Sequence, residues 1–380
     1  MATLQRRFLV KTLFGLESVL ADEIRSLGGS QVEEHNRAVS TVGDMDLCYS
    51  LNYQCRTALA VLMPLHEGTV PDEQALYDLV KQVPWWEYFS LDKTFIIDVV
   101  SYADQFTNSH FLALKCKDAI VDQFREKYNR RPSISKGADI KINVFIKGDH
   151  CIISLDTSGD SLFKRGYRLQ TGRAPINEVL AAGLIYLSGW DQKTPLVDPM
   201  CGSGTIIMEA ALMSSRVAPQ KGRDHFSFMH LNSFERDRWM QIREKAHDAE
   251  LSNTPSLIGR DLDRHTLNLA KSNAANAMIT SIKWEKGDFF NYRPQSKNGV
   301  MIFNPPYDER MPLQDAITFY KQIGDVLKTH FTGWEAWIIS SHLQAVKRVG
   351  LKPSRRIPLF NGPLECRFVH FEMYEGTRAK

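Results

Sequence analysis

The feature that most constrains this chain is a regular alternation of strand-like and helical segments beyond residue 194. Short apolar runs alternate with amphipathic runs, and in chain order these segments cover 194–199, 204–215, 256–261, 264–277, 282–288, 298–304, 314–331 and 335–341. Strands joined by right-handed helical crossovers lie parallel. The pattern therefore predicts an α/β domain built on a doubly wound, mostly parallel sheet. Two further strand-like runs within 356–374 flank Asn361-Gly362, which predicts a closing antiparallel hairpin.

The first half of the chain mixes helix and strand on a smaller scale. Strand-like and helical patterns alternate through 5–10, 15–29, 38–44 and 45–65, as is typical of a ferredoxin-like α+β unit. A second α+β unit follows, with helical segments at 72–89 and 110–128, a strand at 94–103 and a hairpin at 139–159. We see no nucleophile paired with a base there, and we interpret this second unit as a binding module.

These patterns predict four parts along the chain. They are a ferredoxin-like subdomain at 1–70, a binding domain at 71–161, a basic loop-like linker at 162–175 and the doubly wound domain at 176–380. A length of 380 residues is too large for one ordinary core and fits two or three domains.

Composition excludes several classes of protein. Hydrophobic residues make up 43% of the chain and charged residues 24%, which is typical of soluble globular proteins. No apolar run reaches about 18 residues, and the first residues lack a signal-peptide core, so we expect a cytoplasmic protein. The six cysteines are scattered without a CxxC pair or nearby histidines, which predicts reduced thiols and no metal site.

Basic residues are concentrated in a few segments, although the net charge is only +3. Residues 115–136 hold seven Lys or Arg against three acids, and residues 347–356 hold five against none. Such patches are expected where a phosphate-bearing partner binds. Solvated surface is an equally good interpretation of any single patch. The candidate contacts to RNA are Lys115, Lys117, Arg130, Arg131, Lys136, Lys164 and Arg165.

The stretch LVDPMCGSGT, residues 196–205, predicts a ligand site. A strand ends at Asp198, a loop with Gly202 and Gly204 follows, and a helix begins near Thr205. Glycines let a ligand approach the backbone closely, and the amides of a helix N-terminus favour an anionic group. The spacing differs from GxGxxG and from the phosphate-binding loop, and no lysine is placed for a triphosphate. The loop therefore suits a small nucleoside-like ligand that carries a carboxylate.

Acidic residues end the next two strands. Asp261 and Asp263 follow one strand and Asp288 follows the other. An acid at the second strand end commonly binds ribose hydroxyls, about 20 residues beyond the glycine loop. Here the charged and aromatic insertion at 216–255 makes that distance much larger. Each acid taken alone could equally be a helix cap.

The fourth strand ends at Asn304-Pro305-Pro306-Tyr307, where proline cannot continue the strand. An exocyclic amine of a base is a poor nucleophile because its lone pair is delocalised into the ring. The Asn304 side-chain oxygen and the Pro305 carbonyl could each accept one of its N–H bonds and so direct the lone pair towards an electrophile. Tyr307 could stack on the base, a contact worth roughly 1–3 kcal/mol, once the base has left its stack.

The glycine loop, the acidic strand ends and Asn304 to Tyr307 together resemble the class I S-adenosylmethionine-dependent amino-methyltransferases, whose fold is Rossmann-like. A closer resemblance covers essentially the whole chain. It is to the THUMP-domain RNA guanine-N2 methyltransferases, and especially to the RlmL-like enzymes of 23S ribosomal RNA. The segments that carry it are FLVKTLFGLESVLADEI, ALKCKDAIVDQFREKYNRRPSI, SLDTSGDSLFKRGYR, DPMCGSGTIIMEAAL, APQKGRDHFSF and NPPYDER.

The resemblance implies a THUMP domain that captures structured RNA and a second domain that binds S-adenosylmethionine. It implies that Asp198, Cys201, Gly202 and Gly204 border the methionine end of this cofactor. It further implies that Asp261 holds the ribose and Asp288 the adenine, while Asn304, Pro305, Pro306 and Tyr307 hold the target base, Asn304 also beside the cofactor. Asn177 or Glu178 is a further candidate contact to the cofactor. The family often has Gly after NPPY, whereas this chain has Asp308.

We therefore expect methyl transfer from S-adenosylmethionine to guanine N2, in 23S ribosomal RNA. The alternatives are a tRNA guanine-N2 methyltransferase, a DNA adenine-N6 methyltransferase and a catalytically silent RNA-binding assembly factor. We expect structured RNA as the partner, and no membrane, metal or obligate protein partner.

Overall fold

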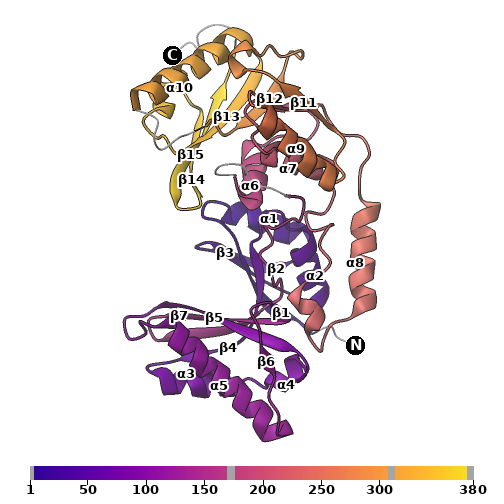
Figure 1. Ribbon diagram of the computed structural model, residues 1–380, viewed down its shortest axis with the longest axis vertical. Helices are drawn as coiled ribbons and strands as arrows, with labels where there is room; N and C mark the ends of the chain where they lie inside the picture. The colour runs from indigo at the N-terminus through magenta and orange to yellow at the C-terminus, as the bar shows by residue number, and fades with distance from the viewer. Residues whose placement is uncertain (1–3, 169–175, 307–312, 375–380) are drawn as a thin grey trace. The chain divides into compact units, whose positions relative to one another are not determined.

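The computed structural model describes residues 4–168, 176–306 and 313–374 and divides the chain into two compact units (Figure 1). The first, which we call the amino-terminal unit, comprises residues 1–12, 20–162 and 223–245. The second, the carboxy-terminal unit, comprises residues 13–19, 163–222 and 246–380. Each unit therefore contains a segment that the chain order alone would assign to the other.

The amino-terminal unit begins with a βαββαβ arrangement. Its elements are β1 (Arg6–Lys11), α1 (Glu17–Ser26), β2 (Ser30–His35), β3 (Ala38–Gly43), α2 (Met45–Gln54) and β4 (Ala60–Thr69). β1 pairs antiparallel with both β3 and β4, and the strand order is β2-β3-β1-β4. This is the ferredoxin-like topology that the sequence predicted. β2 was missed because its residues are polar and almost all exposed, so no buried face marks it.

The rest of the unit extends the same sheet. It contains α3 (Glu73–Lys81), α4 (Trp85–Tyr88), β5 (Thr94–Tyr102), α5 (Ser109–Tyr128), β6 (Ser133–Ile134), β7 (Ile140–Lys147) and β8 (His150–Asp156). β7 and β8 form the predicted hairpin, and β8 pairs antiparallel with β4. The two small α+β halves thus share one eight-stranded sheet. The helix predicted over 72–89 is two helices, since proline at position 84 lacks the amide proton that a continuous helix would use.

The insertion between the glycine loop and the next strand contributes to the amino-terminal unit. It contains η1 (Ser227–His230) and α8 (Arg236–Asp248). The Tyr49 ring on α2 lies 4.8 Å from Phe228 and 6.1 Å from Trp239, measured between ring centroids. Arg238 Nη2 also lies 2.8 Å from Asp46 Oδ2. The aromatic residues noted in the sequence therefore complete a core rather than a surface loop.

The carboxy-terminal unit is the predicted doubly wound domain. Its elements are α6 (Glu178–Ser188), β9 (Leu196–Asp198), α7 (Thr205–Ser214), β10 (Leu257–Asp261), α9 (Arg264–Asn276), β11 (Ile282–Lys286), η2 (Phe289–Asn291), β12 (Gly299–Phe303), α10 (Leu313–His330), β13 (Trp334–Ser340), η3 (Val346–Arg348), β14 (Arg355–Asn361) and β15 (Leu364–Glu372). The sheet order is β11-β10-β9-β12-β13-β15-β14. β9 to β13 run parallel, and β15 is antiparallel to its neighbours β13 and β14.

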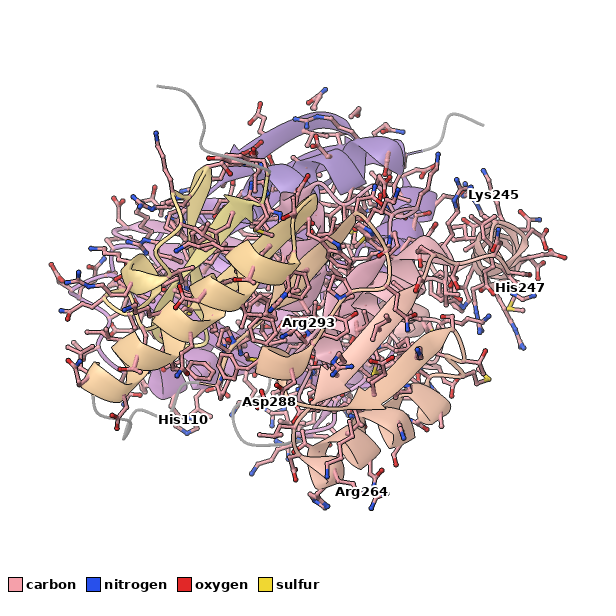
Figure 2. The ribbon with its side chains drawn as sticks, turned by 90° about the horizontal axis from the view of Figure 1, so that it is seen from above. His110, Lys245, His247, Arg264, Asp288 and Arg293 are labelled. Atoms are coloured by element: carbon pink, nitrogen blue, oxygen red, sulfur yellow. The ribbon has the colours of Figure 1, made fainter. Side chains whose placement is uncertain are left out.

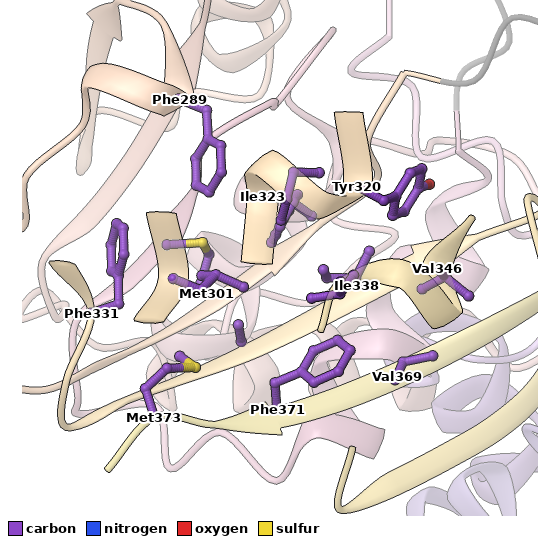
Figure 3. Close-up of a cluster of buried hydrophobic side chains, with 14 of the residues drawn as sticks. Phe289, Met301, Tyr320, Ile323, Phe331, Ile338, Val346, Val369, Phe371 and Met373 are labelled. Carbon is purple, nitrogen blue, oxygen red and sulfur yellow. The ribbon is translucent and has the colours of Figure 1, made fainter. Parts of the chain in front are cut away.

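The core of this unit is built by the alternation of side chains along its strands. On one face α10 contributes Tyr320, Ile323 and Leu327, which pack with Met301 of β12 and Ile338 of β13 (Figure 3). α7 and α9 contact β10 from the other layer (Figure 1). The strand order reverses between β9 and β12. In open α/β sheets, ligands bind outside the carboxyl ends of the strands at such a reversal.

Candidate active site

The glycine loop connects β9 to α7 at the point where the strand order reverses. Its shape is held by two backbone hydrogen bonds, from Cys201 N to Arg260 O at 2.8 Å and from Gly204 N to Cys201 O at 2.8 Å. Gly202 and Gly204 have φ values of +56° and +85°, a region that favours glycine. A Cβ on Gly204 would lie 2.9 Å from Trp284, whereas a Cβ on Gly202 would meet nothing within 4 Å. Gly202 therefore presents its backbone to open space.

The first backbone amides of α7 have no partner within the helix. Its N-cap is Gly204, which has no side chain to accept a hydrogen bond from the first turn. Such a helix N-terminus favours an anionic group through its amides and the helix dipole. The backbone at the start of α7 is therefore suited to bind an anionic group of a ligand.

Asp261 links the end of β10 to the glycine loop. Its Oδ2 accepts a hydrogen bond from Gly202 N at 2.9 Å, and its Oδ1 accepts one from Asp263 N at 2.9 Å. A carboxylate has about four acceptor positions, so Asp261 can accept further hydrogen bonds from a ligand. Asp263 instead caps α9 by accepting from Thr266 N at 2.8 Å. The helix-cap interpretation therefore holds for Asp263.

Asp198 is almost completely buried, with 1% of its surface exposed. Burial raises the pKa of its carboxyl well above the usual range, and the nearby Asp261 adds to this effect. Its hydrogen bond comes from Met200 N, at 3.3 Å. No lysine, arginine or histidine among the described residues forms an ion pair with Asp198. Burial likewise raises the pKa of the Cys201 thiol in the same loop.

Asp288 and Asn304 follow the next two strand ends. Asp288 and Arg293, both labelled in Figure 2, lie in the chain between β11 and β12. Asp288 is half-buried and accepts a hydrogen bond from Phe290 N at 3.0 Å. Asn304 is half-buried, Pro305 is buried and Pro306 is exposed. Tyr307 and Asp308 lie outside the described residues.

The strand register brings these groups to one edge of the sheet. Val197 of β9 pairs with Met301 of β12, and Asp198 pairs with Gly259 of β10. Asp261 pairs with Lys286 of β11. Asp261 and Asn304 therefore both lie about two residues beyond the level of Asp198, on the strands that flank β9. Asp288 lies at the same carboxyl edge.

Arg168 was missed by the sequence reasoning, yet it joins three parts of the site. Its Nε lies 3.1 Å from Glu178 Oε1, and its Nη2 donates to Thr205 Oγ1 at 2.9 Å and to Ile176 O at 2.9 Å. Glu178, predicted to contact a cofactor, is buried and paired with this guanidinium. Burial raises the pKa of Glu178, against the opposing effect of Arg168. Asn177 caps α6 by accepting from Val179 N at 2.8 Å.

One predicted RNA contact needs correction. Arg165 is buried, and its Nε lies 3.4 Å from Glu209 Oε1 on α7. Tyr167 OH donates to the same carboxylate oxygen at 2.8 Å, and burial raises the pKa of Tyr167 well above its usual value. A guanidinium held inside the unit in this way cannot contact RNA. The sequence could not reveal this because Glu209 is 44 residues away.

The other predicted RNA contacts lie on accessible surface. Lys115 and Lys117 are partly exposed on α5, and Lys117 Nζ lies 2.8 Å from Asp118 Oδ1. The four other predicted contacts are exposed, namely Arg130, Arg131, Lys136 and Lys164. Near the end of α5, Lys127 Nζ lies 4.0 Å from the centre of the Trp86 ring. Cations beside aromatic rings are common where proteins bind single-stranded nucleic acid.

Three features bear on other classes of function. The six cysteines are free and buried thiols. Among the described residues, no group of three or more His, Cys, Asp or Glu side chains could hold a metal ion. No helix in the described ranges has the length and apolar character needed to cross a membrane.

Comparisons with known proteins agree with this geometry. Residues 165–370 match the methyltransferase domain described as RMKL-like, residues 70–156 match the THUMP domain and residues 7–62 match the RlmL ferredoxin-like domain. A provisionally named RNA methyltransferase of Synechocystis sp. is 40% identical over 373 residues, which cover 97% of each chain.

Two further proteins are similar over nearly the whole of this chain. The ribosomal RNA large subunit methyltransferase K/L of Syntrophotalea carbinolica is 36% identical over 97% of this chain, although the chain spans only 54% of that protein. The crystal structure of the methyltransferase-like protein SMU.472, solved as a complex with SAH, superposes with a TM-score of 0.89 at 27% identity and covers 100% of both chains. The chain therefore belongs to the RMKL-like family of RNA methyltransferases, with a ferredoxin-like region and a THUMP domain before the methyltransferase domain.

Proposed function

We propose that this protein transfers a methyl group from S-adenosylmethionine to N2 of a guanine in 23S ribosomal RNA. The observation that carries the proposal is the gathering of Asp198, Asp261, Asp288 and Asn304 at one edge of the sheet, beside the open backbone of Gly202. The chain spans about half the length of the relatives named K/L, so their ribosomal substrate supports the proposal only by similarity.

The residues at this edge fit S-adenosylmethionine, which is the methyl donor of this enzyme family. When bound, it supplies an electrophilic methyl group on a positively charged sulfur. The amides at the start of α7 suit its carboxylate, and the buried Asp198 suits its positive charge, since no side chain among the described residues forms an ion pair with Asp198. Asp261 can accept from the ribose hydroxyls and Asp288 from the adenine amine, while Cys201 and Gly202 line the loop. Glu178 acts through Arg168, which fixes Thr205 at the start of α7.

The end of β12 is suited to hold the target amine. The Asn304 side-chain oxygen and the Pro305 carbonyl accept the two N–H bonds of the guanine amine, so that its nitrogen lone pair points at the donor methyl. The nitrogen then forms the new N–C bond while the methyl–sulfur bond breaks, its electron pair stays on sulfur as a neutral thioether, and the nitrogen releases one proton to solvent. Tyr307 keeps its predicted stacking role. Orientation of the two reactants supplies most of the rate enhancement in such a site.

The amino-terminal unit is the proposed RNA-binding part. Its candidate contacts are Lys115, Lys117, Arg130, Arg131 and Lys136, together with Lys164 of the carboxy-terminal unit; Arg165 is withdrawn. Positive charge beside exposed aromatic rings supports this assignment, since Lys115 lies over Phe111 and Lys127 over Tyr128. We propose cytoplasmic ribosomal RNA as the substrate, and we keep 1–70, 71–161, 162–175 and 176–380 as proposed sequence domains.

The direct test is incubation with labelled S-adenosylmethionine and ribosomal RNA from cells that lack the protein, followed by nucleoside analysis. The proposal predicts label in N2-methylguanosine. Label in tRNA would support the tRNA alternative, and N6-methyladenosine in a competition with DNA would support the DNA alternative. An absence of transfer to any nucleic acid, with RNA still bound, would support the assembly-factor alternative.

A further inference from the structure

A cavity of about 270 Å³ lies in the carboxy-terminal unit, outside the groups assigned above. It is formed by the segment that follows β13 and by the β14–β15 hairpin. Three cationic side chains line it: Lys347, Arg356 and Arg367. The remaining wall is largely apolar and includes Leu343, Leu351 and Val369. Its volume is close to the lower end of ordinary ligand pockets, which fits one small unit of a polymer better than a large ligand.

Strand register places this cavity close to the proposed target-base position. Phe303, the residue before Asn304, pairs with Ile338 of β13, and Ile338 pairs with Val369 of β15. Arg367 pairs with Ser340, two residues further towards the carboxyl edge of the parallel strands. β15 is two strands away from β12, a spacing on the order of 10 Å. One RNA strand can therefore reach both Asn304 and the cavity.

The charge of the cavity favours an anionic occupant. Lys347 and Arg356 are exposed, and neither forms an ion pair with any residue that the structure describes. Arg367 Nη1 lies 2.7 Å from Glu365 Oε1, so one of the three cations is partly neutralised. The run 347–356 contains five basic residues and no acid. Two cations that lack an ion-pair partner among the described residues, beside an apolar wall, match a phosphate next to a base.

We infer that this cavity holds a single-stranded nucleotide that neighbours the methylated guanosine. The inference rests on the proposed function, because it places the pocket on the same RNA strand as the target base. Lys347 and Arg356 bind the phosphate, and the apolar wall receives the base or ribose. The pocket thereby selects an unpaired target region, since a paired neighbour could not enter it.

The test compares the full-length protein with the double variant Lys347→Gln/Arg356→Gln. A matched control, Lys271→Gln/Lys321→Gln, removes two exposed lysines of the same unit outside the cavity. The probes are a short single-stranded oligonucleotide of guanosine and uridine, and polyglutamate as an acidic polymer without bases. We would measure the Kd of each probe at several salt concentrations, together with the Kd of S-adenosylmethionine.

We expect the cavity variant to bind the oligonucleotide about 10-fold more weakly, as expected when charge-assisted hydrogen bonds are removed. The slope of log Kd against log salt should fall by about 0.7 for each phosphate that is no longer neutralised by a cation of the protein. The Kd of S-adenosylmethionine and the behaviour of the control should match wild type. Equal oligonucleotide binding by the cavity and control variants would overturn the inference, as would an equal weakening of polyglutamate binding. Neither result depends on methyl transfer, so failure of the proposed function would be recognised separately, as absence of N2-methylguanosine with the wild-type protein.

Discussion

At the scale of single residues, the proposed role of Asp198 in ligand binding opposes the stability of the fold. The fold buries this carboxyl, and no described side chain forms an ion pair with it, so its pKa is raised. A carboxyl whose pKa is higher in the folded than in the unfolded state stabilises the fold at low pH. That contribution is lost as the pH rises through the folded pKa. Binding of a cationic ligand has the opposite requirement, because it needs the ionised carboxylate.

Replacement of Asp198 by Asn should therefore separate its effect on the stability of the fold from its effect on ligand binding. We expect Asp198→Asn to raise Tm at neutral pH by about 2–4 °C, the shift that about 1 kcal/mol causes in a domain of 150–250 residues. S-adenosylmethionine should bind at least about 10-fold more weakly, since a buried charge interaction is lost. Calorimetry across pH gives the check: in the wild type, affinity for the ligand should fall as the pH is lowered through the raised pKa. An affinity independent of pH in the wild type, and equal in the variant, would contradict this role.

At the scale of elements, residues 223–245 of the insertion belong to the amino-terminal unit through their aromatic side chains. Trp239 of α8 is 3% exposed, and its ring centroid lies 5.3 Å from Tyr53 and 5.2 Å from Phe228. Burial of large aromatic side chains is a major contribution to a core. These residues are thus a structural part of the amino-terminal unit, although they lie in the chain between two strands of the methyltransferase sheet.

Truncation of Trp239 should destabilise this unit selectively. We expect Trp239→Ala to cost about 3–5 kcal/mol, the usual cost of removing a buried Trp or Phe side chain. RNA binding should weaken with it, while the affinity for S-adenosylmethionine should stay close to wild type, because the groups assigned to that ligand belong to the other unit. Met240→Ala, at a position that is 48% exposed, is the matched control and should have little effect. Thermal unfolding that is the same for both variants would show that the insertion carries no such role.

The sequence predicted elements well where periodicity and chain order determine them. Apolar residues recur at regular spacing within each of these segments. The segments are the parallel strands, the closing hairpin and the ferredoxin-like beginning. The burial or pairing of a residue cannot be predicted from local periodicity when it depends on a residue far away in the sequence. Arg165 is in a basic stretch, and only its packing against Glu209 shows that it is buried. The polar strand β2 is defined by its pairing with β3, not by a buried face.

At the scale of the whole molecule, the two compact units are not consecutive pieces of chain. Residues 13–19 belong to the carboxy-terminal unit, where a Cβ on Gly183 would come within 2.5 Å of Leu16 and the Phe14 and Phe360 rings are 5.5 Å apart. The chain then returns to the amino-terminal unit at residue 20 and again at residue 223. Domains defined as consecutive stretches of sequence cannot describe two units that are built from alternating segments of the chain.

A fragment that begins at residue 163 should therefore be less stable than the same unit in the full chain. It loses Leu16, which is fully buried, and it carries the insertion without the Tyr49 ring that packs on Phe228. The loss of one buried leucine alone costs about 2–5 kcal/mol. A dye that fluoresces on exposed apolar surface should bind the fragment and not the full chain. A fragment with the Tm of the full chain and no dye binding would show that the exchanged segments contribute little.

We propose that Asn304, at the end of β12, orients a guanine amine for methyl transfer. The most direct measurement is the kcat for N2-methylguanosine formation by Asn304→Ala, with Asn268→Ala as an exposed control on α9. We predict that kcat falls by at least about 100-fold, the effect of removing one group that acts mainly in the transition state, while RNA binds as in the wild type. Unchanged kcat in Asn304→Ala, with normal RNA binding, would contradict the account.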